Sequence, residues 1–152
     1  MQMTVSRDIA ASATTVWATI TDIDGSAQVL SAVERIERLD DHASFGVGVR
    51  WRETRVMFGR ESTEELEVTD VNPPHSYTAR AESSGTSYTS VLRVEPLGEH
   101  HCRLTMSFDA EPSGLLGRLL AATLGRLFRR ATRDALRQDL ADIAANAEGD
   151  AT

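Results

Sequence analysis

The sequence predicts one α+β domain in which a seven-stranded antiparallel sheet wraps around a long C-terminal helix. A short alternating segment and two short helical segments come first, and further alternating segments follow through residue 111. The chain then closes with one amphipathic helix over residues 114–147. Because the apolar face of such a helix must be covered, it should lie in the concavity of the sheet. The order of elements therefore predicts a pocket, but it does not identify an active site.

The first elements are one strand and two short helices. Residues 4–9 alternate as a strand, and Ser12 is a good N-cap for a helix that should end near Asp22. After the turn at Asp24-Gly25, a second short helix is expected over residues 26–30. These helices would close one end of the sheet.

Six more strands are expected between turn residues. Their ranges are 33–39, 48–58, 61–71, 76–82, 86–95 and 102–111. Asn72-Pro73-Pro74-His75 and Ser83-Ser84-Gly85 give the turn signals on either side of the fourth of these strands. The strand at 61–71 is expected to be acidic on its outer face. With the first strand, the sheet would have seven.

The closing helix has an apolar face and a basic face. One sector of roughly 100° contains Leu116, Leu120, Leu124, Leu127, Ala131 and Ala135. The opposite sector contains Arg118, Arg126, Arg129, Arg130, Arg133 and Arg137. We expect the first sector, from Leu116 to Ala131, to be buried and the arginines to be exposed. Leu136, Leu140 and Ile143 drift from the first sector, so the helix either bends, with Gly125 as its weak point, or packs its second half elsewhere on the sheet.

Composition limits the function classes. The chain is 41% apolar and 26% charged, as in ordinary globular proteins, and its net charge of −7 argues against nonspecific nucleic-acid binding. Cys102 is the only cysteine, so an intrachain disulfide is excluded. The sequence has neither a signal-peptide pattern nor an apolar run near the ~20 residues of a membrane span, so a cytoplasmic protein is expected. We expect one domain over residues 1–147 and a frayed tail at 148–152.

Three sequence motifs resemble those of the SRPBCC superfamily. The opening of the superfamily resembles residues 9–12, Ile-Ala-Ala-Ser, followed by residues 16–22, Val-Trp-Ala-Thr-Ile-Thr-Asp. Its third strand resembles residues 46–53. Its fourth turn and fifth strand resemble residues 68–74 together with Tyr77. The superfamily includes START lipid-transfer domains, pollen-allergen-like proteins and the polyketide cyclase/dehydrase family. The resemblance covers essentially the whole chain and implies a helix-grip fold. The segment at 28–30 departs from it, because many members carry a tryptophan there.

The resemblance implies a pocket between the concave strand face and the last helix. Its expected lining is Trp51, Glu53, Arg55, Tyr88, Ser90, Met106, Phe108, Leu120 and Leu124. Glu53 and Arg55 lie two apart on one strand face, so they could pair with each other or receive a polar ligand group. Glu53 is the only carboxylate proposed as a general acid or base. The alternatives are a structural ion pair at the sheet edge and the opposite strand parity.

Three functions remain open on the sequence. The resemblance implies binding of a lipid-, polyketide- or isoprenoid-like molecule that is hydrophobic or amphipathic. The second possibility is a polyketide cyclase/dehydrase-type enzyme that uses a pocket carboxylate, for which Glu53 is the candidate. The third is a protein-interaction module with a filled cavity. Trp17, Trp51, Tyr77 and Tyr88 could stack on a ligand or pack in the core.

No cofactor or metal is expected. The four histidines, His42, His75, His100 and His101, lie in predicted turns without metal-ligand spacing. The arginine face, at Arg126, Arg129, Arg133 and Arg137, could meet anionic lipid headgroups or an acidic partner. The favoured alternative is a solvated face paired with acidic residues such as Asp134, Asp139 or those of the strand at 61–67. A monomer and a homodimer are both compatible with the sequence.

Overall fold

The computed structural model describes the chain except residues 58, 84, 151 and 152. The expected strand end at Phe58 and the turn position Ser84 therefore lie outside the described residues. The described residues form the strands β1 (Gln2–Ile9), β2 (Val33–Arg38), β3 (Arg50–Met57), β4 (Arg60–Asn72), β5 (Ser76–Ser83), β6 (Thr86–Gly98) and β7 (His101–Pro112). The helices are α1 (Ala13–Thr21), α2 (Ser26–Val29) and α3 (Gly114–Asp150). The predicted α+β helix-grip architecture is confirmed.

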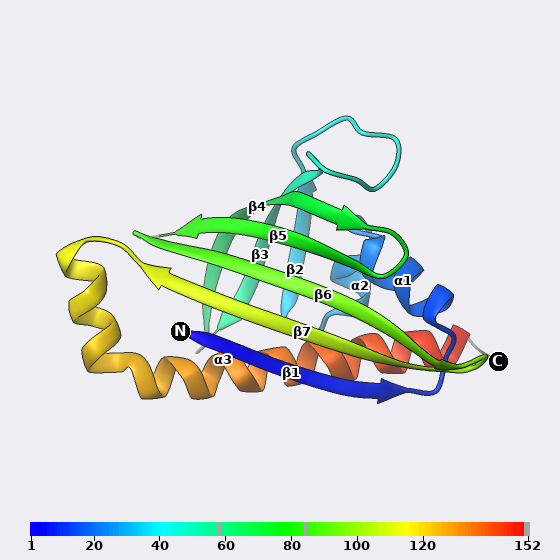
Figure 1. Ribbon diagram of the computed structural model, residues 1–152. Coiled ribbons are helices and arrows are strands. Elements are labelled where there is room, and N and C mark those ends of the chain that lie inside the picture. Colours follow the sequence, from blue (N-terminus) through cyan, green and yellow to red (C-terminus); the bar gives the residue numbers. More distant parts are fainter. Residues whose placement is uncertain (58, 84, 151–152) are drawn as a thin grey trace.

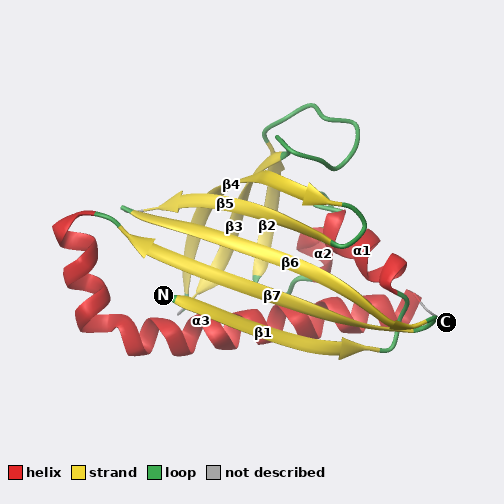
Figure 2. Cartoon of the chain, in the orientation of Figure 1, coloured by secondary structure: helices red, strands yellow, loops and turns green. Residues whose placement is uncertain are grey.

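All strands join one antiparallel sheet in the order β1-β7-β6-β5-β4-β3-β2. The pairing register shifts in β2, β4 and β6, and such irregularities bend strands and increase their twist. The sheet accordingly curves around α3, while α1 and α2 lie together at one end (Figures 1 and 2).

The core lies between the concave sheet face, α1 and the C-terminal half of α3. Ser12 is the N-cap of α1, as predicted, because its Oγ accepts a hydrogen bond from the Thr15 N–H at 3.1 Å. Val16 and Ile20 of α1 are buried together with Leu140, Ile143, Ala144 and Ala147 of α3. The helix continues past the expected end at Ala147, where the Glu148 carboxylate accepts a hydrogen bond from the Ala10 N–H at 3.0 Å.

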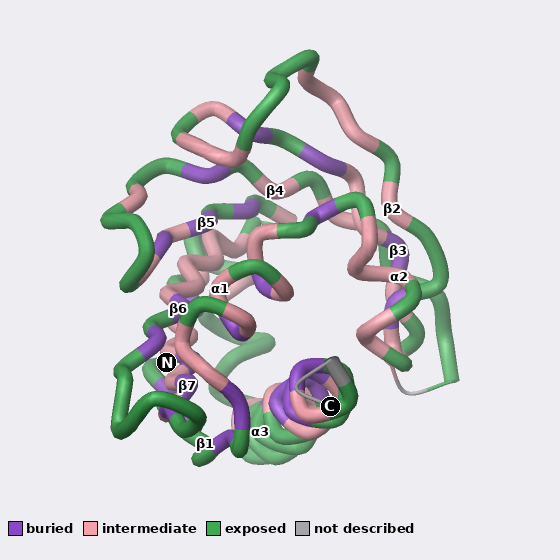
Figure 3. The backbone as a smooth tube through the Cα atoms, turned by 90° about the vertical axis from the view of Figure 1, so that its right-hand side faces the viewer, coloured by how far each residue is buried: buried purple, intermediate pink, exposed green. Residues whose placement is uncertain are grey.

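The expected burial of the first half of α3 is wrong. Leu116, Leu120, Leu124 and Leu127 are 51–74% exposed, and Ala131 is only half-buried. The helix has 37 residues, or about 55 Å measured along its axis, whereas the longest strands have 13 residues and span about 43 Å. Figure 1 shows the first turns of α3 (yellow) running at a steep angle to the rest, and Figure 3 shows burial concentrated near its C-terminal end.

One hydrogen bond in the first half of α3 is of a kind that favours bending. Thr123 Oγ1 donates to the Leu119 carbonyl at 2.5 Å, and threonine bonds of this kind often bend helices. Gly125, the expected weak point, has nothing within 4 Å of where a Cβ would stand, so no close approach requires a glycine there. The exposure of Arg126, Arg129, Arg133 and Arg137 agrees with the prediction.

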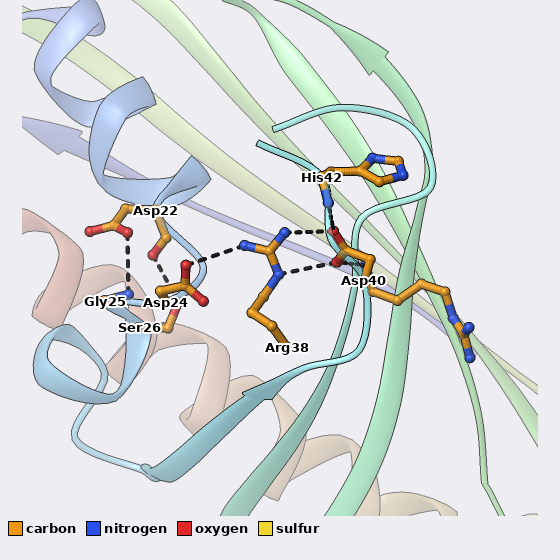
Figure 4. A network of polar contacts seen from close by, with 8 residues as sticks. Asp22, Asp24, Gly25, Ser26, Arg38, Asp40 and His42 are labelled. Carbon is orange, nitrogen blue, oxygen red and sulfur yellow. Dashed lines mark hydrogen bonds and ion pairs between the residues drawn. The ribbon is translucent and has the colours of Figure 1, made fainter. Parts of the chain in front are cut away.

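A polar network fastens the loop of residues 39–49 to the end of β2. The Arg38 guanidinium donates to both oxygens of Asp40, at 3.1 and 2.7 Å, and to Asp24 at 3.3 Å (Figure 4). Asp40 also accepts from the backbone N–H groups of His42 and Arg50. The hydrogen bond from Arg38 and these N–H groups hold the pKa of Asp40 well below its usual range.

Candidate ligand-binding cavity

A cavity of about 220 Å³ lies between the concave sheet face and the C-terminal half of α3. Residues of α1 and α2, among them Ile20 and Val29, close one end of it. Most of its wall is apolar, and the aromatic part includes Tyr88 and Phe108, whose ring centroids are 5.6 Å apart. The cavity therefore has the mixed character of a site for a small molecule, with an apolar wall and a few polar groups.

Seven of the nine expected lining residues are on the wall of this cavity. They are Trp51, Glu53, Arg55, Tyr88, Ser90, Met106 and Phe108. Trp51, Glu53 and Arg55 therefore face the cavity together, as their alternation along the strand predicted. Whether these side chains contact a ligand remains a prediction.

Leu120 and Leu124 do not reach this cavity. They line a second hollow, between the first half of α3 and the ends of β6 and β7. The prediction placed them on the cavity wall because it assumed that the first half of α3 covers the sheet. Tyr88 and Phe128 line both hollows and therefore stand between them.

A charged cluster ties the sheet to α3 across the cavity. The Arg55 guanidinium donates to both carboxylate oxygens of Asp139, at 3.1 and 2.7 Å, and its Nε donates to Glu53. The second oxygen of Glu53 accepts from the Trp51 indole N–H at 3.2 Å. The side chains of Arg55, Glu53 and Asp139 are only 22%, 12% and 5% exposed. Glu53 thus faces the cavity, but two donors already hold it.

Burial and charge have opposite effects within this cluster. Burial raises the pKa of Asp139, and the positive charge of Arg55 only partly offsets that effect. Burial acts to lower the pKa of Arg55, but the negative charges of Glu53 and Asp139 outweigh it and raise the pKa. Arg55 is therefore held in its charged form by two carboxylates.

Glu64 is a cavity residue that the sequence interpretation missed. It lies directly opposite Glu53 in the β3–β4 register and lines the cavity. Burial, followed by repulsion from Glu53, raises the pKa of Glu64, while Arg55 acts to lower it. The sequence could have indicated this position, because alternate residues of a strand share a face and Glu64 alternates with the inward residues Leu66 and Val68. The strand was interpreted only as acidic on its outer face, and Glu64 was not considered for the cavity.

Two polar residues of α3 were also missed. Thr132 and Asp139 are seven residues apart, which is about two helical turns, and both line the cavity. Asp139 pairs with Arg55, so the expectation that it serves the exposed arginine face is wrong. The Thr132 hydroxyl is buried and has no hydrogen-bond partner among the described residues. The sequence feature that could have indicated both is the position of Leu136, Leu140 and Ile143 outside the sector of the earlier leucines, because it implies that a different face of the helix is buried in the second half.

Two classes of site have no support in the described part of the chain. Residues 1–57, 59–83 and 85–150 contain no group of three or more His, Cys, Asp or Glu side chains placed to hold a metal ion. In the same residues, no helix has the length and apolar character that crossing a membrane requires.

Comparison with solved structures identifies the same fold. The protein TTHA0849 from Thermus thermophilus matches with a TM-score of 0.83 and 16% identity, over 100% of both chains. The Zhui aromatase/cyclase from Streptomyces sp. R1128 matches with a TM-score of 0.80 and 18% identity, over 97% of this chain and 93% of that one. A START superfamily protein from Mycobacterium smegmatis gives 0.79 and 14%, over 97% of each chain. At these identities the likeness shows the fold alone.

Sequence comparison identifies the family. No curated protein sequence matches the chain at a significant level. A family model described as polyketide cyclase / dehydrase and lipid transport matches residues 1–148, nearly the whole chain. The resemblance inferred from the sequence motifs is thereby confirmed, and the chain belongs to the polyketide cyclase/dehydrase and lipid transport family.

Proposed function

We propose that the protein binds a small amphipathic molecule in the cavity between its sheet and the C-terminal half of α3. The observation that carries the proposal is one cavity with both an aromatic wall, at Tyr88 and Phe108, and a buried charged cluster, at Arg55 and Asp139. The apolar part of a guest would lie on the rings, and its polar part would face the cluster. The family description, which combines cyclase/dehydrase and lipid transport, supports the proposal.

The cavity favours a compact guest. Its volume of about 220 Å³ lies below the ~300–1,000 Å³ that is typical of sites for drug-sized ligands. A compact ring system therefore suits the space better than a long acyl chain. Among the three functions considered above, the interaction module required a filled cavity, and this cavity is open.

Catalysis of the cyclase/dehydrase type is the second candidate. It is favoured by Glu64, a half-buried carboxyl group on the cavity wall whose pKa is raised by burial. A carboxylic acid of this kind can give a proton to a bound substrate. Glu53, the residue proposed from the sequence, is held by Arg55 and Trp51, which leaves it less free to transfer a proton. In the catalytic alternative, Glu64 is therefore the better general acid.

Filling the cavity tests the binding proposal. Ser90 lines the cavity, so Ser90→Phe should reduce the affinity for a neutral apolar probe such as N-phenyl-1-naphthylamine by about tenfold or more. Thr89→Phe is the matched control, because the neighbouring residue of a strand points to the opposite sheet face. Fluorescence titration measures both. Equal affinities in the two variants, or probe binding only as the protein unfolds, would contradict a preformed site.

A further inference from the structure

We infer that the ligand of this cavity carries a positively charged nitrogen, a protonated amine, that binds the carboxylate of Glu64. This inference rests on the proposed binding function and names the chemical class of the ligand. Three observations support it: the charges on the cavity wall, a buried hydroxyl without a partner among the described residues, and the aromatic wall beside Glu64.

The charges on the cavity wall do not balance. Three carboxylates, Glu53, Glu64 and Asp139, share one guanidinium, Arg55, among the described lining residues. Arg55 already donates to both Glu53 and Asp139, so Glu64 has no cation of its own in this set. Glu53 and Glu64 are also directly paired across β3 and β4, an arrangement in which like charges destabilise a sheet. A cation beside Glu64 would compensate this negative charge.

An independent observation comes from the opposite wall of the cavity. Thr132 on α3 is only 5% exposed, it lines the cavity, and its hydroxyl has no hydrogen-bond partner among the described residues. Buried polar groups in folded proteins nearly always have a partner. A hydroxyl oxygen can accept from an ammonium N–H, and a ligand that fills this space can provide the missing partner. The helix therefore contributes to the cavity lining a residue whose hydroxyl lacks a partner among the described residues.

The surroundings of Glu64 suit the rest of such a ligand. Glu64 and Tyr88 line the same cavity, and burial, followed by the negative charge of Glu64, raises the pKa of Tyr88. Tyr88 and Phe108 both line the cavity, and aromatic rings attract other aromatic groups and, over their faces, cations. An aromatic amine would place its ring there and its nitrogen at Glu64. An anionic ligand would meet three carboxylates and an arginine that is already paired.

A matched ligand series tests the inference. The probes are 2-(2-naphthyl)ethylamine, the corresponding alcohol 2-(2-naphthyl)ethanol and the anion 2-naphthylacetate, titrated calorimetrically at pH 7. The amine should bind about tenfold more tightly than the alcohol, because a charge-assisted hydrogen bond replaces a neutral one, and the anion should bind most weakly. Amine and alcohol of equal affinity would overturn the inference and leave the binding function standing.

Two variants locate the amine site. Glu64→Gln keeps the side-chain size and should reduce the amine's advantage to about threefold or less, with little change for the alcohol. Glu67→Gln removes the same charge at an exposed position on the outer face of β4 and should preserve the preference. A preference that survives Glu64→Gln would overturn the assignment to Glu64. If none of the three compounds nor the neutral probe binds the folded protein, the proposed function itself fails, and this inference fails with it.

Discussion

The two halves of α3 have similar apolar faces but very different surroundings. In the first half, Leu115, Leu116, Leu119, Leu120, Leu124 and Leu127 are 51–79% exposed. In the second half, Leu140, Ile143, Ala144 and Ala147 are at most 4% exposed. Helical periodicity therefore shows which face of a helix is apolar, but it does not show whether the sheet extends far enough to cover that face.

Polar contacts fix the second half of α3 to the rest of the domain. Asp139 pairs with Arg55 of β3, and Asp142 accepts hydrogen bonds from the backbone N–H and the hydroxyl of Ser31 at 2.8 and 2.7 Å. Near the end of the helix, Glu148 accepts from the Ala10 N–H. These contacts lie at separate points along the second half, so they set both its position and its rotation over the cavity.

Removing Arg55 should have the largest effect. Arg55→Met leaves Glu53 and Asp139 buried without their cation, so the free energy of unfolding should fall by about 3–5 kcal/mol. Arg52→Met is the matched control. Arg52 also pairs with two carboxylates, but its side chain is 39% exposed, against 22% for Arg55, so its loss should cost about 1 kcal/mol or less. Urea denaturation measures both, and equal costs would contradict the role given to the buried cluster.

The same leucine-to-alanine change should separate the two halves of α3. Leu140 is 2% exposed, and Leu140→Ala should cost about 2–5 kcal/mol because it leaves a cavity in the core. Leu120 is 51% exposed, and Leu120→Ala should cost about 0.5 kcal/mol or less. Denaturant titration compares the two. A larger cost at Leu120 would mean that the first half of α3 packs on the sheet in solution, as the helical wheel alone predicted.

The smallest expected effect concerns pH. Because the pKa of Glu64 is raised in the folded protein, the folded state holds this proton more tightly than the unfolded state. The contribution of Glu64 to the free energy of unfolding should therefore fall as pH rises from below the ordinary glutamate pKa towards neutrality, whatever the other carboxyl groups contribute. Glu64→Gln removes this loss, so the variant should be the more stable protein at pH 7 and should lose its advantage at pH 4. Thermal unfolding of the unliganded proteins measures the difference, and a variant less stable than wild type at pH 7 would contradict it.

Much of the fold and part of the site followed from the sequence. Strand alternation and turn residues located the seven strands, and the parity of Trp51 placed Glu53 and Arg55 on the cavity wall. Glu64 was missed because its neighbours in β4 are exposed acids, although the strand pairing places it opposite Glu53. Thr132 and Asp139 were missed because burial along α3 depends on the reach of the sheet, which is a property of the tertiary structure.

The two tryptophans allow the central claim to be tested in one experiment. Trp51 lines the cavity and donates its indole N–H to Glu53, whereas the Trp17 ring packs edge-on against Phe45 and Tyr77 and is not part of the cavity lining. In a ¹H–¹⁵N NMR titration with N-phenyl-1-naphthylamine, the indole signal of Trp51 should shift in a saturable way, with a much smaller shift for Trp17. Saturable shifts confined to the exposed residues Leu120 and Leu124, with Trp51 unchanged, would contradict a ligand site beneath the C-terminal half of α3.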